Sequence, residues 1–115
     1  MQITDSVLCH IDDLDDPGSK GFTIIANGSE TAIFLVKKEG HFFAYQNTCP
    51  HTGVSLDWVE DQFLDMDGAL IQCAVHGALF SIDKGTCISG PCLGDRLKPI
   101  DITVKDNHVI LSSFK

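Results

Sequence analysis

The chain has 115 residues, 43% of them hydrophobic, which is enough for one domain with one modest core. Its net charge of −8 excludes nucleic acid and anionic membranes as natural partners; an acidic surface attracts a basic partner protein, and it also simply keeps a protein soluble. No apolar run approaches the roughly 18 residues of a membrane span, and the first residues do not read as a signal peptide. We therefore expect a soluble, cytoplasmic protein.

The first part of the chain predicts β-strands separated by turns. An apolar piece at residues 7–9 precedes an acidic stretch at 12–18, which is typical of a surface loop. Runs of β-branched and aromatic side chains predict strands at residues 22–25, 31–37 and 42–46. Asn27-Gly28 predicts the first turn, and the glycine loop at 38–41 makes the last two strands a hairpin.

The second part continues the same pattern. Strands are expected at residues 69–72, 79–82, 86–88 and 108–111, and an alternating tail strand carries Leu97, Ile100, Ile102 and Val104. Turns are expected at 65–68, 83–85 and 106–107. No 11-residue window has a convincing period of 3.6 residues, so the predicted fold class is all-β.

Two short motifs carry the chemistry. Cys49-Pro50-His51 has the form C-x-H, and after 21 further residues the segment from Cys73 to Gly77 has the form C-x-x-H-G. Two thiols and two imidazoles suit a transition metal rather than Ca²⁺ or Mg²⁺, which prefer oxygen ligands. A Cys₂His₂ zinc module is compatible with this ligand set, although C-x-H is tighter than the usual zinc spacing.

The context of the motifs narrows the choice. Pro50 lies inside the first motif, Phe80 follows His76 by four residues, and Gly90-Pro91 comes further on. With these features the chain resembles the Rieske [2Fe–2S] proteins, in their small soluble ferredoxin-like branch. The resemblance extends over nearly the whole chain and implies an antiparallel β-sandwich with a small cluster-binding subdomain.

The resemblance also implies how the chain is divided and which residues bind the cofactor. One Rieske domain would span residues 1–115, with its cluster-binding part at about 47–92 and the base domain formed by the remainder. Cys49 and Cys73 would bind one iron of a single [2Fe–2S] cluster, and His51 and His76 the other. Glycines after both motifs would place N–H groups near the sulfides, and the Gly90-Pro91 loop would cover the cluster.

Ligand charge sets the reduction potential. Two thiolates bring the oxidised [2Fe–2S] core to zero formal charge, whereas four would bring it to −2, so mixed ligation makes reduction easier. High-potential members of the family read H-G-S-x-Y at the second motif and carry a disulfide between the two loops. Here Ala78 and Phe80 lack both hydroxyls, and Val54 and Val75 stand where the disulfide would be. The resemblance therefore implies a potential in the lower part of the Rieske range.

The implied function is that of a soluble electron carrier, not an enzyme by itself. It would pass single electrons between a reductase and an oxygenase or another reductase, with redox proteins as its partners. The alternative is a small subunit of a larger reductase, similar to the small subunit of assimilatory nitrite reductases. No glycine-rich phosphate loop indicates a second cofactor.

The remaining cysteines and histidines have simpler interpretations. Cys9 lies in an apolar piece and is expected in the core, with no ligand role for it or for His10. His41 is expected to be solvated, and His108 to lie on the surface. Cys87 and Cys92 flank the Gly90-Pro91 loop and could be small buried residues, a short-loop disulfide or redox-active thiols; a reducing compartment favours the first.

Overall fold

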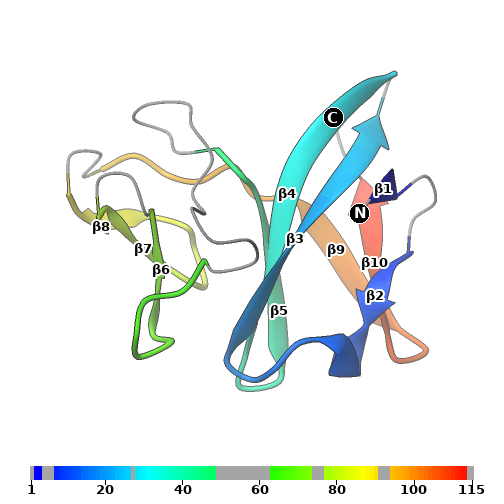
Figure 1. Ribbon diagram of the computed structural model, residues 1–115, viewed down its shortest axis with the longest axis horizontal. Coiled ribbons are helices and arrows are strands. Elements are labelled where there is room, and N and C mark those ends of the chain that lie inside the picture. Colours follow the sequence, from blue (N-terminus) through cyan, green and yellow to red (C-terminus); the bar gives the residue numbers. More distant parts are fainter. Residues whose placement is uncertain are drawn as a thin grey trace.

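Figure 1 shows the computed structural model, which describes residues 2–3, 7–26, 28–48, 63–73, 77–90 and 94–113. The strands are β1 (Gln2–Ile3), β2 (Val7–His10), β3 (Gly18–Ala26), β4 (Ser29–Lys38), β5 (His41–Gln46), β6 (Leu70–Gln72), β7 (Leu79–Ser81), β8 (Cys87–Ser89), β9 (Asp101–Lys105) and β10 (His108–Ser113). The one short helix in these ranges is the 3₁₀ turn η1 (Ile11–Asp13). The all-β prediction is confirmed, and no helix among the described residues is long and apolar enough to cross a membrane.

The strands form three sheets. The first has the order β1-β3-β4-β5, the second β2-β10-β9 and the third β6-β7-β8. Every pair is antiparallel except β1 with β3. In Figure 1 the third sheet lies on one side of the long β3-β4-β5 sheet, and the β2-β10-β9 sheet lies on the other.

Strand β4 separates two hydrophobic cores. Phe34 and Val36 belong to the core beneath the third sheet, whereas Ile33 and Leu35 belong to the core against β2 and β10. All four side chains are fully buried, at 0% exposure. Successive side chains point to opposite faces of a strand, so a strand covered on both faces must be apolar without interruption. This explains why the four residues from Ile33 to Val36 are apolar without alternation.

The predicted tail strand was too long. Leu97 belongs to the first core and Ile100 to the second, while Val104 is 49% exposed. The strand itself begins only at Asp101. Before it, the N–H groups of Gln46 and Ile100 bond to the carbonyl oxygens of Lys98 and Ala44, each at 2.9 Å. Leu97 and Ile100 are three residues apart, so their side chains enter different cores as this segment runs along the edge of β5.

The turns fall close to where they were expected, and one of them is stabilised by a side chain from a distant part of the chain. In the β4–β5 turn Glu39 and Gly40 both have positive φ, at 53° and 78°, as a two-residue hairpin turn of type I′ requires. The carboxylate of Asp16 accepts hydrogen bonds from both of their N–H groups at 2.8 Å. The acidic stretch is therefore more than a surface loop: it also buries Leu14, and β3 already begins at Gly18.

We expect the Asp16 contact to make stability depend on pH in the acidic range. The hydrogen bonds from Gly40 and then Glu39 lower the pKa of Asp16 below its ordinary value. A carboxyl group with a lowered pKa stabilises the fold above its unfolded pKa of about 4, and this contribution is lost as pH falls through the lower folded pKa. Asp16→Asn should therefore lower the melting temperature at pH 7, and the difference from wild type should shrink below about pH 4.

Thermal unfolding of both proteins between pH 7 and pH 3 is the measurement, with Asp15→Asn as the matched control on an exposed neighbour. A difference that stays constant down to pH 3 would show that the Asp16 charge does not hold the turn.

Candidate metal centre

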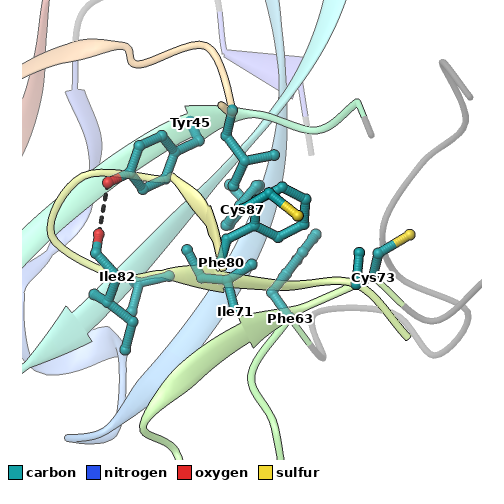
Figure 2. Close-up of a cluster of buried hydrophobic side chains, with 11 residues drawn as sticks. Tyr45, Phe63, Ile71, Cys73, Phe80, Ile82 and Cys87 are labelled. Carbon is teal, nitrogen blue, oxygen red and sulfur yellow. Dashed lines mark hydrogen bonds between the residues drawn. The ribbon is translucent and has the colours of Figure 1, made fainter. Parts of the chain in front are cut away.

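Of the four expected ligands, Cys73 is the one that the structure describes. Cys49, His51 and His76 lie outside the described residues. Cys73 directly follows β6, and its side chain is fully buried at 0% exposure. Figure 2 shows its sulfur directed away from the Phe63 and Ile71 side chains of the first core.

The second motif begins and ends on one hairpin. The N–H of Cys73 donates to the carbonyl oxygen of Ala78, and the N–H of Gly77 donates to the carbonyl oxygen of Cys73, both at 2.8 Å. Gly77 has a φ of 68°, a conformation that favours glycine. Beyond these bonds Gln72 pairs with Leu79 in the β6–β7 ladder. The glycine of C-x-x-H-G is thus required for closing the turn that carries the motif.

The Gly90-Pro91 loop begins very close to this turn. A Cβ atom on Gly90, which follows β8, would lie 2.8 Å from the Cα of Ala78 and 3.1 Å from its Cβ. Real Cβ atoms do not approach so closely, so only glycine fits here. The contact places Gly90 against Ala78, the residue after the second motif, and residues 91–93 of the loop lie outside the described residues.

The segment 49–62, which contains the first motif, is flanked on both sides by residues that the fold holds in place. Before it, the N–H of Asn47 donates to the carbonyl oxygen of Ala32 at 2.9 Å. After it, the ring of Phe63 stacks on Phe34 with centroids 4.3 Å apart and planes at 4°. The N–H of Gln72 donates to the carbonyl oxygen of Phe63 at 2.9 Å. Phe63 is therefore a core residue, and residues 49–62 before it lie outside the described residues.

A tyrosine joins the third sheet to the first. Tyr45 on β5 is buried, and its hydroxyl donates to the carbonyl oxygen of Ile82 at 2.5 Å, as Figure 2 shows. Burial, and then the charge of Asp83, raises the pKa of Tyr45 to about 12, so the hydroxyl keeps its proton at neutral pH. A Cβ atom on Gly85 would lie 2.7 Å from the tyrosine ring. Nothing local in the sequence indicated this contact; the one available signal is that the chain has a single tyrosine.

The other cysteines fit the interpretation as small core residues where the structure describes them. Cys9 is 7% exposed and packs in the second core, so its prediction is confirmed. Cys87 is 2% exposed in the first core, and its sulfur donates to the carbonyl oxygen of Ser89 at 3.4 Å. Cys92 lies outside the described residues. Ala78 and Phe80 are both fully buried, so two hydroxyl-free side chains line the first core next to the second motif.

The described residues fit a thiolate-bound metal group. A buried cysteine opens a glycine-closed turn, and its thiolate would be a soft ligand of the kind that transition metals take. The family model of the Rieske [2Fe-2S] domain matches residues 4–111. The chain belongs to the Rieske [2Fe–2S] domain family. The expected cofactor is thereby confirmed as one [2Fe–2S] cluster, which the residues of this chain would hold.

Two of the curated relatives are ferredoxin components of oxygenase systems. The chain is 40% identical over 82 residues to the alkene monooxygenase system ferredoxin component of Xanthobacter autotrophicus, covering 71% of this chain and 61% of that protein. It is 27% identical over 105 residues to the 3-phenylpropionate/cinnamic acid dioxygenase ferredoxin subunit of Photorhabdus laumondii, covering 91% and 90%. The chain therefore spans less than two thirds of the first relative and nearly all of the second.

Solved structures show the same fold. The ferredoxin of carbazole 1,9a-dioxygenase from Nocardioides aromaticivorans superimposes with a TM-score of 0.72 at 18% identity, covering 95% of this chain and 97% of that one. A ferredoxin of Sphingomonas yanoikuyae superimposes with a TM-score of 0.71 at 24% identity, covering 96% and 99%. The predicted Rieske-type architecture is confirmed.

Proposed function

We propose that this chain is the ferredoxin component of a multi-component oxygenase system and carries single electrons to the oxygenase. The observation that carries the proposal is the Rieske match over residues 4–111 together with relatives that are ferredoxin components of such systems. The protein is an electron carrier and not a catalyst by itself. The relatives named above favour this function over that of a small nitrite-reductase-like subunit.

Four residues would hold the cluster: Cys49, His51, Cys73 and His76. When bound, the cluster supplies a site that accepts and gives up one electron. The two thiolates would bind one iron and the two imidazoles the other, which keeps the total charge low and the reduced state accessible. In domain terms, residues 47–92 would form the cluster-binding part of one domain over 1–115, and the remaining residues its base.

The chain's own residues hold the site in place and keep it dry. Ala78 and Phe80 present buried apolar side chains, Gly90 lets the covering loop approach, and Tyr45 fastens the third sheet to the first. A rigid and poorly hydrated site needs little reorganisation when its charge changes. We further infer a cytoplasmic location, since cysteine ligands stay available in a reducing compartment.

The test combines composition with electron delivery. The purified protein should contain about two irons and two sulfides per chain. After anaerobic reduction with dithionite, mixing with the oxidised oxygenase component of a Rieske-ferredoxin-dependent system should restore the oxidised spectrum of the carrier. One zinc and no sulfide per chain would refute the cluster, and a reduced carrier that no oxygenase component reoxidises would refute the proposed partner.

The buried alanine at the second motif predicts a change in potential. Ala78→Ser should raise the reduction potential, because a hydroxyl donated to a cluster sulfur stabilises the added electron. One hydrogen bond contributes about 1 kcal/mol, which for one electron is about 40 mV. Phe80→Tyr should act in the same direction where its hydroxyl reaches a sulfur.

Protein-film voltammetry measures these shifts, and Ala44→Ser is the control because Ala44 is equally small and buried in the second core. We expect wild type in the lower part of the roughly −150 to +300 mV Rieske range. A wild-type value near the top would show that the missing hydroxyls do not set the potential.

A further inference from the structure

Two histidines from opposite ends of the chain face each other on the β2-β10-β9 sheet. His10 is the last residue of β2, His108 is the first of β10, and the two are directly paired in the antiparallel register. Their ring centroids are 5.2 Å apart, with the planes at 82°. His108 is thus partly covered by His10 rather than simply exposed, and neither residue has a role in the proposed electron transfer.

Hydrogen bonds to the backbone engage one nitrogen of each ring. The Nδ1 atom of His108 lies 2.8 Å from the carbonyl oxygen of Asp106, so Nδ1 carries the proton and Nε2 has the free lone pair. This is the arrangement of metal-binding histidines, whose second nitrogen commonly donates to a carbonyl or carboxylate. In His10, Nδ1 accepts a hydrogen bond from the N–H of Asp12 at 3.1 Å, which leaves Nε2 as its outer nitrogen.

The separation of the rings suits one shared ion. With a zinc–nitrogen distance of about 2.1 Å and about 1.1 Å from nitrogen to ring centre, each centroid would lie about 3.2 Å from the ion. Two centroids 5.2 Å apart then subtend an angle of about 109° at the ion. That is the tetrahedral angle which zinc prefers.

Charges around the pair favour a cation. The Oδ2 atom of Asp12 lies 3.6 Å from Nδ1 of His10, and the carboxylate of Asp13 accepts a hydrogen bond from the backbone of His10 at 2.9 Å. Asp106 lies in the turn before His108. Two lysines oppose them: Lys105 is paired with His108 on β9, and the Nζ atom of Lys37 donates to the carbonyl oxygen of Ile11 at 2.8 Å. Three carboxylates against two ammonium groups leave the neighbourhood negative by one charge.

We propose that His10 and His108 form a binding site for a divalent transition-metal ion, with Zn²⁺ as its simplest occupant. Both Nε2 atoms bind the ion, and water fills the remaining positions, because no group of three or more metal-binding side chains occurs among the described residues. On binding, the proton of His10 moves from Nε2 to Nδ1, so Nδ1 no longer accepts the hydrogen bond from the Asp12 N–H. The Asp12 carboxylate, whose Oδ2 atom lies 3.6 Å from Nδ1, is the group that turns toward the new N–H. The total proton count is unchanged.

The test is a titration of the tag-free protein, with its cluster in place, with zinc chloride. Isothermal calorimetry measures the stoichiometry and affinity, and NMR monitors the imidazole nitrogens. The variants are His10→Asn and His108→Asn. Asparagine at position 10 still accepts the Asp12 N–H, and at position 108 it still donates to the Asp106 carbonyl, so both local structures are kept. His41→Asn is the matched control, because His41 is an exposed histidine on β5.

We expect one zinc per chain, with both rings shifting together in the NMR spectrum. Affinity should fall about tenfold or more in each of the two variants and stay unchanged in His41→Asn. The visible spectrum should stay constant throughout, which separates this site from the cluster and its ligands. Absence of binding to wild type, or binding that survives either variant, overturns the two-histidine site.

Discussion

Replacing Cys73 by serine should remove the cluster, whereas the same change at Cys9 should leave it in place. Both cysteines are buried, at 0% and 7% exposure, so burial alone does not distinguish them. Cys73 opens the glycine-closed turn of the second motif, where its thiolate would be the ligand that a soft metal site requires. A serine hydroxyl is a poor substitute, so iron content should drop from about two per chain to near zero.

Cys9 is in a different environment. Burial, and then the nearby charge of Asp13, raises its pKa, so the side chain is a neutral thiol at pH 7. Cys9→Ser buries a hydroxyl in the second core and should cost about 1 kcal/mol of stability without loss of iron.

Iron and sulfide analysis and the visible spectrum measure the effect on both variants. Because metal binding contributes to folding free energy, Cys73→Ser should also melt earlier than Cys9→Ser. A Cys73→Ser protein that keeps two irons and its colour would contradict the ligand assignment.

The strands and the ligand motifs could be predicted because both are encoded locally. Alternation, β-branched runs and glycine turns lie within a few residues of one another, and C-x-H and C-x-x-H-G are complete in short segments. The turn at Asp106 and Asn107 has both residues at positive φ, as a two-residue hairpin turn requires. Such features need no knowledge of the rest of the fold.

The contacts that the sequence did not reveal all join distant segments. Asp16 holds the turn at Glu39 and Gly40, and Tyr45 bonds to Ile82. Each of these side chains, read alone, is an ordinary acidic loop residue or an ordinary strand aromatic. Their partners become neighbours only once β4 and β5 are placed between the two cores, so no local pattern predicts them.

The same limit explains the tail and the histidine pair. Leu97 and Ile100 are three residues apart, which in a strand means opposite faces, and they belong to different cores. His10 carried no sign of a ligand role in the sequence because His108 comes from the other end of the chain. The apolar pattern of a sequence predicts that a residue is buried. It does not predict in which core the residue lies or which residue is its partner on the neighbouring strand.

Replacing Gly90 by alanine should loosen the packing of the Gly90-Pro91 loop against the second motif. Gly90 has a φ of 107°, and a Cβ atom there would lie 2.8 Å from the Cα of Ala78. Gly90→Ala therefore combines backbone strain of about 1–3 kcal/mol with a clash against backbone that cannot rotate away. The loop should move off the second motif, admit water, and shorten the lifetime of the cluster.

Gly94→Ala separates these two causes. Gly94 has a similar φ of 96°, but no heavy atom lies within 4 Å of the added Cβ. Gly94→Ala should lower the free energy of unfolding through backbone strain alone. Gly90→Ala should lower it by about 1–3 kcal/mol more, because the added methyl group is also overpacked. At about 4 °C per kcal/mol, the two melting temperatures should differ by about 4–12 °C.

Bleaching of the visible absorption at fixed temperature measures the lifetime of the cluster, and circular dichroism measures the fold. Gly90→Ala should bleach faster than Gly94→Ala even at temperatures where both proteins are folded, because only Gly90 touches the turn that carries Cys73. Equal bleaching rates would mean that strain in the loop, and not its contact with Ala78, controls access to the cluster.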